Sequence, residues 1–134
     1  ADSGRVGDTR TSVESVARLL KSAPKRIQRK MDRIGELTHQ AKHALERAGK
    51  HFLGHLLNEA QKELEALGVS DAGLNKLIYF ARKEGALGAK LTGGGNGGCI
   101  IALAQNEVHS KLLAEKLRKY GATAVWPFVL KKQK

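Results

Sequence analysis

A glycine run in the last third of the sequence separates two short apolar segments. Five of the six residues in Gly93–Gly98 are glycine, and Asn96 is the exception. The flanking segments, Leu87–Leu91 and Cys99–Ala104, are shorter than ordinary helices and are typical of buried strands. We therefore expect a strand, a tight glycine loop and a second strand, which the rest of the chain must cover.

The segment before the glycine run has the periodicity of helices. Thr11 with Glu14 three residues later fits a capping box that opens a first short helix. Pro24 fits the first turn of a second, long helix that stops at Gly49. We expect the buried stripe of this second helix to consist of Ile27, Met31, Ile34, Ala41 and Leu45.

Two further helices are expected before the first strand. The third ends at Gly68, Ser70 or Asp71 then caps the fourth, and Gly85 terminates it. The inward residues expected on the third helix are Leu53, Leu56, Leu57, Ala60, Leu64 and Leu67. Those expected on the fourth are Leu74, Leu77, Ile78 and Ala81.

A fifth helix and a third strand are expected after the glycine run. Asn106 can cap a helix that ends at Gly121 and turns Leu112, Leu113 and Leu117 inward. Residues 122–130 then favour a strand, in which Pro127 suits an edge or bulge. The fold class expected is α+β, a helix bundle packed on a small sheet, with residues 1–134 forming a single domain.

Composition restricts the function without deciding it. The chain has 24 Lys and Arg against 13 Asp and Glu, a formal charge of +11, which leaves a basic polyanion-binding module open as an alternative. Aromatic residues are only 4% of the chain, few for the stacking platforms of single-strand binders, so we expect no nucleic-acid partner. No apolar run reaches the length of a membrane span, and one cysteine suits a reducing compartment. We expect a cytoplasmic protein with no membrane partner.

The glycine run itself has two interpretations. Glycines allow positive φ angles and let backbone N–H groups converge on an anion, as in a phosphate cradle. They also occur in ordinary tight connections between strands. The dinucleotide-binding (Rossmann) fingerprint is excluded, because a strand rather than a helix is expected after the run. The P-loop is excluded, because Gly97-Gly98-Cys99 lacks its Gly-Lys-Ser/Thr ending.

The run and its flanks resemble the third sequence motif of the GHMP small-molecule kinases. That motif is usually written Lys-Leu/Met-Thr-Gly-Ala-Gly-x-Gly-Gly-Cys, and Lys90–Cys99 departs from it only by glycine instead of alanine at Gly94. The segments Leu57–Gln61, Leu67–Ser70 and Gly85–Lys90 are similar to mevalonate kinases in particular. The opening of the chain, through Thr9 and Arg10, is similar to the passage between the two domains of such kinases.

The resemblance implies a GHMP kinase C-terminal-domain-like fold. It also implies the C-terminal half of an ATP- and Mg²⁺-dependent enzyme that phosphorylates the primary hydroxyl of mevalonate in isoprenoid precursor synthesis. The same half of a galactokinase, homoserine kinase or phosphomevalonate kinase is the alternative within the superfamily. The family places the glycine loop beside phosphate and substrate, here Thr92, Gly93, Gly94 and Gly95, and more weakly places Thr9 near the substrate.

The resemblance also implies what the chain lacks. The main ATP-binding loop, the catalytic residues and the metal-binding acid lie mostly in an N-terminal domain that is absent from this chain. We therefore expect no catalytic residue here, an inactive isolated chain, and the missing domain, mevalonate and ATP as partners. The intact enzyme could be a homodimer. A β-branched residue at Gly95 is expected to impair function more than folding.

Several polar residues have ordinary interpretations beside functional ones. His39 with His43, and His51 with His55, have the i, i+4 spacing of helical metal ligands, but no Glu follows the first His and we expect surface histidines and no metal. Asn58 and Gln61 border a leucine stripe, where an approach to the active site and a hydrogen bond to a neighbouring loop are both open.

Overall fold

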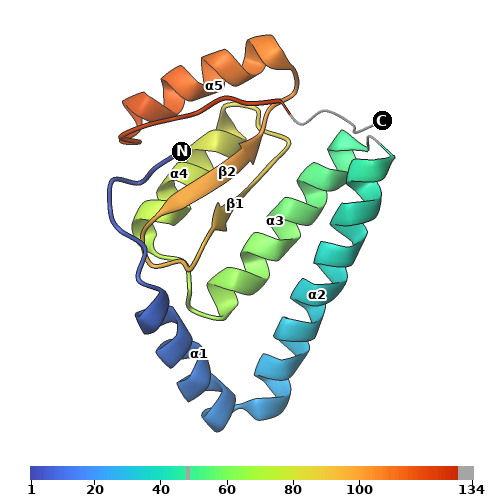
Figure 1. Cartoon of the computed structure of the whole chain (residues 1–134), viewed down its shortest axis with the longest axis vertical. Coiled ribbons are helices and arrows are strands. Elements are labelled where there is room, and N and C mark those ends of the chain that lie inside the picture. Colours follow the sequence, from blue (N-terminus) through green and yellow to red (C-terminus); the bar gives the residue numbers. More distant parts are fainter. Residues whose placement is uncertain (48, 130–134) are drawn as a thin grey trace.

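The computed structural model describes residues 1–47 and 49–129, in which five helices surround a two-stranded antiparallel sheet (Figure 1). The α+β class is confirmed. None of the described helices is long and apolar enough to cross a membrane. The elements are α1 (Thr9–Ser22), α2 (Pro24–Glu46), α3 (Lys50–Ala66), α4 (Ala72–Lys83), β1 (Gly88–Thr92), β2 (Cys99–Leu103) and α5 (Glu107–Lys119).

The two predicted strands pair with each other across the glycine loop. Thr92 lies opposite Cys99 at the loop end, and Gly88 lies opposite Leu103 at the other. Asp2 extends the sheet by a single bridge to Cys99 and a second to Ala124. Asp2 and Ala124, far apart in the sequence, therefore lie side by side next to β2.

The third strand predicted over residues 122–130 is wrong for the part that the structure describes. Of residues 122–129, Ala124 alone forms a bridge, and Leu130 lies outside the described residues. Trp126 and Phe128 are 62% and 73% exposed. Their preference for strands has no effect here, because β propensity depends on a surface to pack against and these side chains have none.

The main core lies between one face of the sheet and helices α4 and α5. Ala89, Leu91 and Ile100 point into it from the strands. All four inward residues predicted for α4 are buried there, and Leu113 and Leu117 meet them from α5. Leu112, also predicted inward, is 49% exposed.

A second core cluster joins α2 to α3, which lie side by side in Figure 1. Leu37 and Ala44 of α2 are buried in it, and neither was predicted. Met31 and Leu45, which were, are 42% and 50% exposed. The predicted Ile27 is buried, Ile34 is half-buried and Ala41 packs against this cluster, so the predicted stripe is right at these three residues and wrong at Met31 and Leu45.

The capping box predicted at the start of the first helix is wrong. Asp8 is the cap, and its carboxylate accepts hydrogen bonds from the Thr11 amide (3.0 Å) and hydroxyl (2.7 Å). Glu14 instead pairs with Arg10 (3.1 Å) on the helix surface. Asp and Thr compete for the same cap position, and the aspartate three residues earlier takes it.

Helix α3 lies against the outer edge of β1. The backbones approach closely at Gly54 and Gly88, where a Cβ on either residue would collide with the other segment. Asn58 Oδ1 accepts from the Ala89 amide (3.0 Å), and Gln61 Oε1 accepts from the Leu91 amide (2.9 Å). Two side-chain amides therefore take the hydrogen-bonding place of a neighbouring strand.

Candidate functional site

The loop between β1 and β2 has the backbone that glycine permits. Gly93, Gly95, Gly97 and Gly98 have φ angles of 84°, 82°, 102° and 88°. Asn96 has φ 49° and is the one described non-glycine residue with a positive φ. Residues with a Cβ adopt such angles only at a cost, so this loop shape needs its glycines.

One half of the loop is built into the structure. Asn96 donates its amide hydrogen to the Val69 carbonyl (2.9 Å), and its Nδ2 donates to the buried Ser12 Oγ (2.7 Å). Gly95 is buried, and a Cβ on it would collide with the Val69 carbonyl oxygen. The turn before α4 and the first turn of α1 therefore hold this half in place.

The first residues of the chain wrap around the same half. Gly98 donates to the Arg5 carbonyl (2.7 Å), and Ser3 donates to the Gly98 carbonyl (2.9 Å). Asp8 donates its amide hydrogen to the Gly95 carbonyl (3.2 Å). The N-terminal segment thus fixes this half of the loop through main-chain hydrogen bonds.

The other half of the loop is open. Thr92 and Gly93 are exposed, and a Cβ on Gly93 would meet nothing within 4 Å. The amides of Gly93 and Gly94 donate to no acceptor in the described part of the chain. Thr9 lies against Gly94 so closely that a Cβ there would collide with the Thr9 hydroxyl. The structure therefore gathers Thr9, Thr92, Gly93 and Gly94 at one surface.

Gly95 is the exception among the candidate site residues, because it belongs to the buried half. No local pattern predicts this division, because Val69 and Ser12 are 26 and 84 residues from the loop positions they contact. The structure also explains why this chain has glycine rather than alanine at position 94. Glycine leaves the space that the Thr9 side chain occupies.

The acids around the loop are already engaged. Arg5 Nη2 lies 2.6 Å from Asp71 Oδ1, and this hydrogen bond holds the pKa of the Asp71 carboxyl below its usual value. Asp71 also caps α4 by accepting from the Leu74 amide (2.9 Å), which confirms the predicted cap. Hydrogen bonds from Thr11 lower the pKa of Asp8. Both carboxylates cap helices, and the second oxygen of Asp71, Oδ2, is buried without a hydrogen-bond partner among the described residues.

Lys90 is the cation next to the loop in sequence. Burial lowers the pKa of its ammonium group, and its Nζ donates to the Leu91 carbonyl (2.7 Å) at the outer edge of β1. Within the residues described, no group of three or more His, Cys, Asp or Glu could hold a metal ion. The open half of the loop offers amide and hydroxyl donors, which suit an anion such as phosphate.

A family model described as "GHMP kinases C terminal" matches residues 10–123.

The chain belongs to the GHMP kinase family.

Proteins named mevalonate kinase are similar to this GHMP kinase chain over most of its length. The one from Pyrococcus abyssi is 39% identical over 119 residues, which are 85% of this chain and 36% of that protein. The one from Aeropyrum pernix is 43% identical over 106 residues, 77% of this chain and 32% of that protein. The chain thus spans about a third of the length of these relatives.

Solved structures agree with the family. The L. major mevalonate kinase in complex with R-mevalonate matches with a TM-score of 0.87 at 28% identity, over 93% of this chain and 39% of that one. The Methanococcus jannaschii mevalonate kinase matches with a TM-score of 0.58 at 30% identity, over 86% of this chain and 33% of that one. The predicted GHMP kinase C-terminal fold is confirmed.

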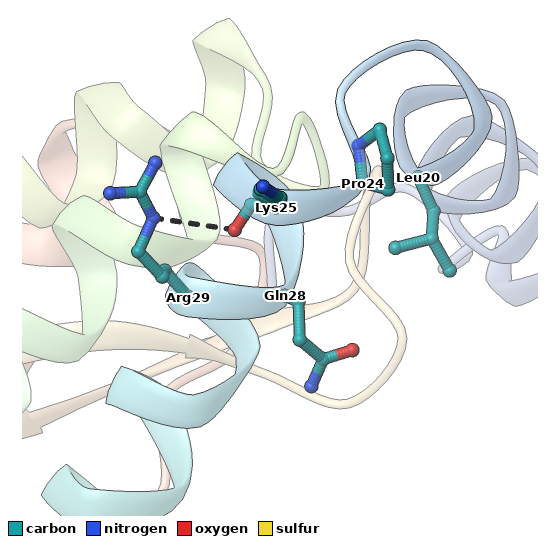
Figure 2. Close-up of a pocket in the computed structure, with 5 residues that line it drawn as sticks. All are labelled: Leu20, Pro24, Lys25, Gln28 and Arg29. Carbon is teal, nitrogen blue, oxygen red and sulfur yellow. Dashed lines mark hydrogen bonds between the residues drawn. The ribbon is translucent and has the colours of Figure 1, made fainter.

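Two hollows lie along α2 of this GHMP kinase chain, one beside α1 and the other beside α3, and no residue of the glycine loop is among their lining residues. Figure 2 shows the larger, an open hollow of about 610 Å³. It is lined by Leu20, Pro24, Lys25, Gln28 and Arg29, and Arg29 Nε donates to the Lys25 carbonyl there (3.3 Å). The smaller is lined by Arg26, Arg29, Lys30, Arg33 and Glu63.

Proposed function

We propose that the chain is the C-terminal part of an ATP-dependent mevalonate kinase, which transfers phosphate to the primary hydroxyl of mevalonate in the cytoplasm for isoprenoid precursor synthesis. The names of its relatives support this substrate. Because the chain spans about a third of those proteins, an N-terminal domain would supply the catalytic acid and base, the metal ligands and most of the ATP site.

This chain's own role in the kinase would be to bind phosphate or substrate at the open half of the glycine loop. Unpaired amides at Gly93 and Gly94 lie beside the hydroxyl-bearing residues Thr92 and Thr9. Donors fixed in this way can orient a phosphate or a substrate oxygen without reorganising during the reaction. Mg²⁺ would neutralise charge on the bound triphosphate. The loop would position the transferred group without exchanging protons with it.

Replacement of Gly93 in the intact kinase tests this role. Asn tolerates a positive φ, and the space around Gly93 is open, so Gly93→Asn should fold while its side chain enters the site of the phosphate. We expect kcat/KM to fall by about tenfold or more, since misplacement at such a site can reduce the rate by about 10²-fold.

Gly121→Asn is the matched control. Gly121 also has a positive φ, 110°, and open surroundings, but it follows α5 and lies outside the loop. Its kinetics should stay within about twofold of wild type, and both variants should melt within a few degrees of wild type. Equal kinetics in the two variants would show that the open half is only a turn.

A comparison of the rates at which the intact kinase phosphorylates mevalonate, galactose, homoserine and phosphomevalonate would distinguish a mevalonate kinase from the related kinases.

The smaller hollow on α2 favours polyanion binding as a second candidate function. Four cationic side chains line it, and Glu63 is the one acid among its lining residues. A polyanion binder that neutralises several phosphates loses affinity steeply between 50 and 200 mM salt, by about 10³-fold or more for six phosphates. Duplex DNA binding without this salt dependence would exclude the second candidate.

A further inference from the structure

The first of the two histidine pairs has no role in the proposed function. His39 and His43 are one turn apart on α2, and both are exposed. Their rings are nearly perpendicular (83°) with centroids 4.8 Å apart. The Nε2 atom of His43 lies 3.3 Å from the Nε2 atom of His39.

This separation matches two ligands of one metal ion. Imidazole nitrogens bind Zn²⁺ at about 2.0–2.1 Å, and two such nitrogens at a tetrahedral angle are about 3.3 Å apart. A ligand pair that must first be brought together loses side-chain entropy on binding. Here the two nitrogens already face each other at the required distance.

A carboxylate lies on the opposite side of one ring. Glu46 Oε2 is 4.0 Å from His43 Nδ1. Metal-binding histidines usually direct the second ring nitrogen toward a carboxylate or carbonyl, which favours the proton on that nitrogen. For both Nε2 atoms to bind one metal ion, each ring must carry its proton on Nδ1, so the hydrogen bond between the two Nε2 atoms is broken on binding and its proton moves to Nδ1 of the donor ring.

We propose that His39 and His43 chelate a late divalent transition metal ion, such as Zn²⁺ or Ni²⁺, through their Nε2 atoms. Imidazole is a preferred ligand of these metals, and water would complete the coordination. The site revises the sequence-based expectation of ordinary surface histidines. It is also independent of the loop, because it lies toward the C-terminal end of α2.

The chain contains its own control for this site. His51 and His55 on α3 have the same i, i+4 spacing and are also exposed. The described structure records no contact between their rings. Spacing alone would give both pairs the same affinity, whereas the observed geometry favours His39 with His43.

Calorimetric titration of the 134-residue chain with Ni²⁺, and separately with Zn²⁺, tests the proposal. We expect one site per chain, and at least a tenfold loss of affinity in His39→Gln and in His43→Gln. The matched variants His51→Gln and His55→Gln should stay within twofold of wild type. In ¹⁵N NMR spectra, the Nε2 signals of His39 and His43 should be the first to respond to Zn²⁺.

Three results would overturn the site. The double variant His39→Gln/His43→Gln could bind as tightly as wild type, the loss could follow His51 and His55 instead, or wild type could bind neither metal. Because the altered side chains are exposed, circular dichroism should show that the variants remain helical. If the double variant lost helix, the affinities of the two folded single variants would decide.

Discussion

Adjacent glycines in the loop have different physical roles. Gly93 needs its hydrogen side chain for the backbone angle alone, because the space around it is open. Gly95 needs it for the angle and also for the Val69 carbonyl that covers it. The expectation that a β-branched residue at Gly95 would impair function more than folding does not allow for this collision, so Gly93 is the position at which function can be tested separately.

Alanine substitutions should separate these roles. A left-handed conformation costs about 1–2 kcal/mol for a residue with a Cβ, so Gly93→Ala should lower the free energy of unfolding by about that amount. Gly95→Ala adds a steric overlap of the kind that costs about 1–3 kcal/mol, giving about 2–5 kcal/mol in total. Urea denaturation of both variants measures the difference. Equal losses would mean that Val69 moves aside without cost.

At the scale of elements, the start of α4 is tied to the beginning of the chain. Asp71 caps the helix and binds Arg5, whose carbonyl in turn holds Gly98. The ion pair is partly exposed, with Arg5 51% and Asp71 20% accessible, so we expect it to contribute at most about 1 kcal/mol. Its importance lies in linking α4 to the loop.

This link should make stability depend on pH. The pKa of Asp71 is lower in the folded chain than its usual value near 3.9, so the unfolded chain binds the proton more readily. The stabilisation is then present above about pH 4 and is lost as pH falls through the lowered pKa. In Asp71→Asn, which keeps a good cap residue, urea unfolding should show a smaller loss of stability between pH 5 and 2 than wild type. An unchanged pH profile would contradict the role of the Arg5 pair.

The helices, strands and caps could be predicted from the sequence more accurately than the contacts between them. The α4 core residues, the Asp71 and Asn106 caps and the two strands follow from local periodicity and capping, and all are confirmed. The residues of α2 that face α3, Leu37 and Ala44, depend on where the partner helix lies, which periodicity does not specify. The contacts of the loop with Arg5 and Val69 connect distant segments, and only the fold reveals them.

At the scale of the whole molecule, apolar side chains remain uncovered beside the loop. Val6, in the segment that wraps around the loop, is 93% exposed, and Val13 on α1 is 62% exposed. Under the proposed function, the remaining two-thirds of the enzyme would cover them, since domains that share an active site bury facing surfaces.

The isolated chain should therefore be inactive and should bind an apolar dye. A coupled assay with mevalonate, ATP and Mg²⁺ should detect no turnover, because the groups that neutralise and orient the reacting atoms are expected in the other domain. Dye fluorescence should fall in Val6→Ser/Val13→Ser relative to wild type. Turnover near the roughly 1–100 per second of ordinary kinases would contradict the proposal that the catalytic groups lie in the N-terminal domain.

The side-chain amides along β1 also determine where the sheet stops. An uncovered edge strand can template another strand, and this is a common route to aggregation. Asn58 and Gln61 occupy the Ala89 and Leu91 amides that such a strand would need. Gln61 is buried and its Nε2 also donates to Ser70 (3.1 Å), so it cannot easily swing away. Copies of this chain therefore cannot pair edge to edge at β1. The two-stranded sheet needs no charged residue, proline or bulge on this edge strand to prevent such pairing.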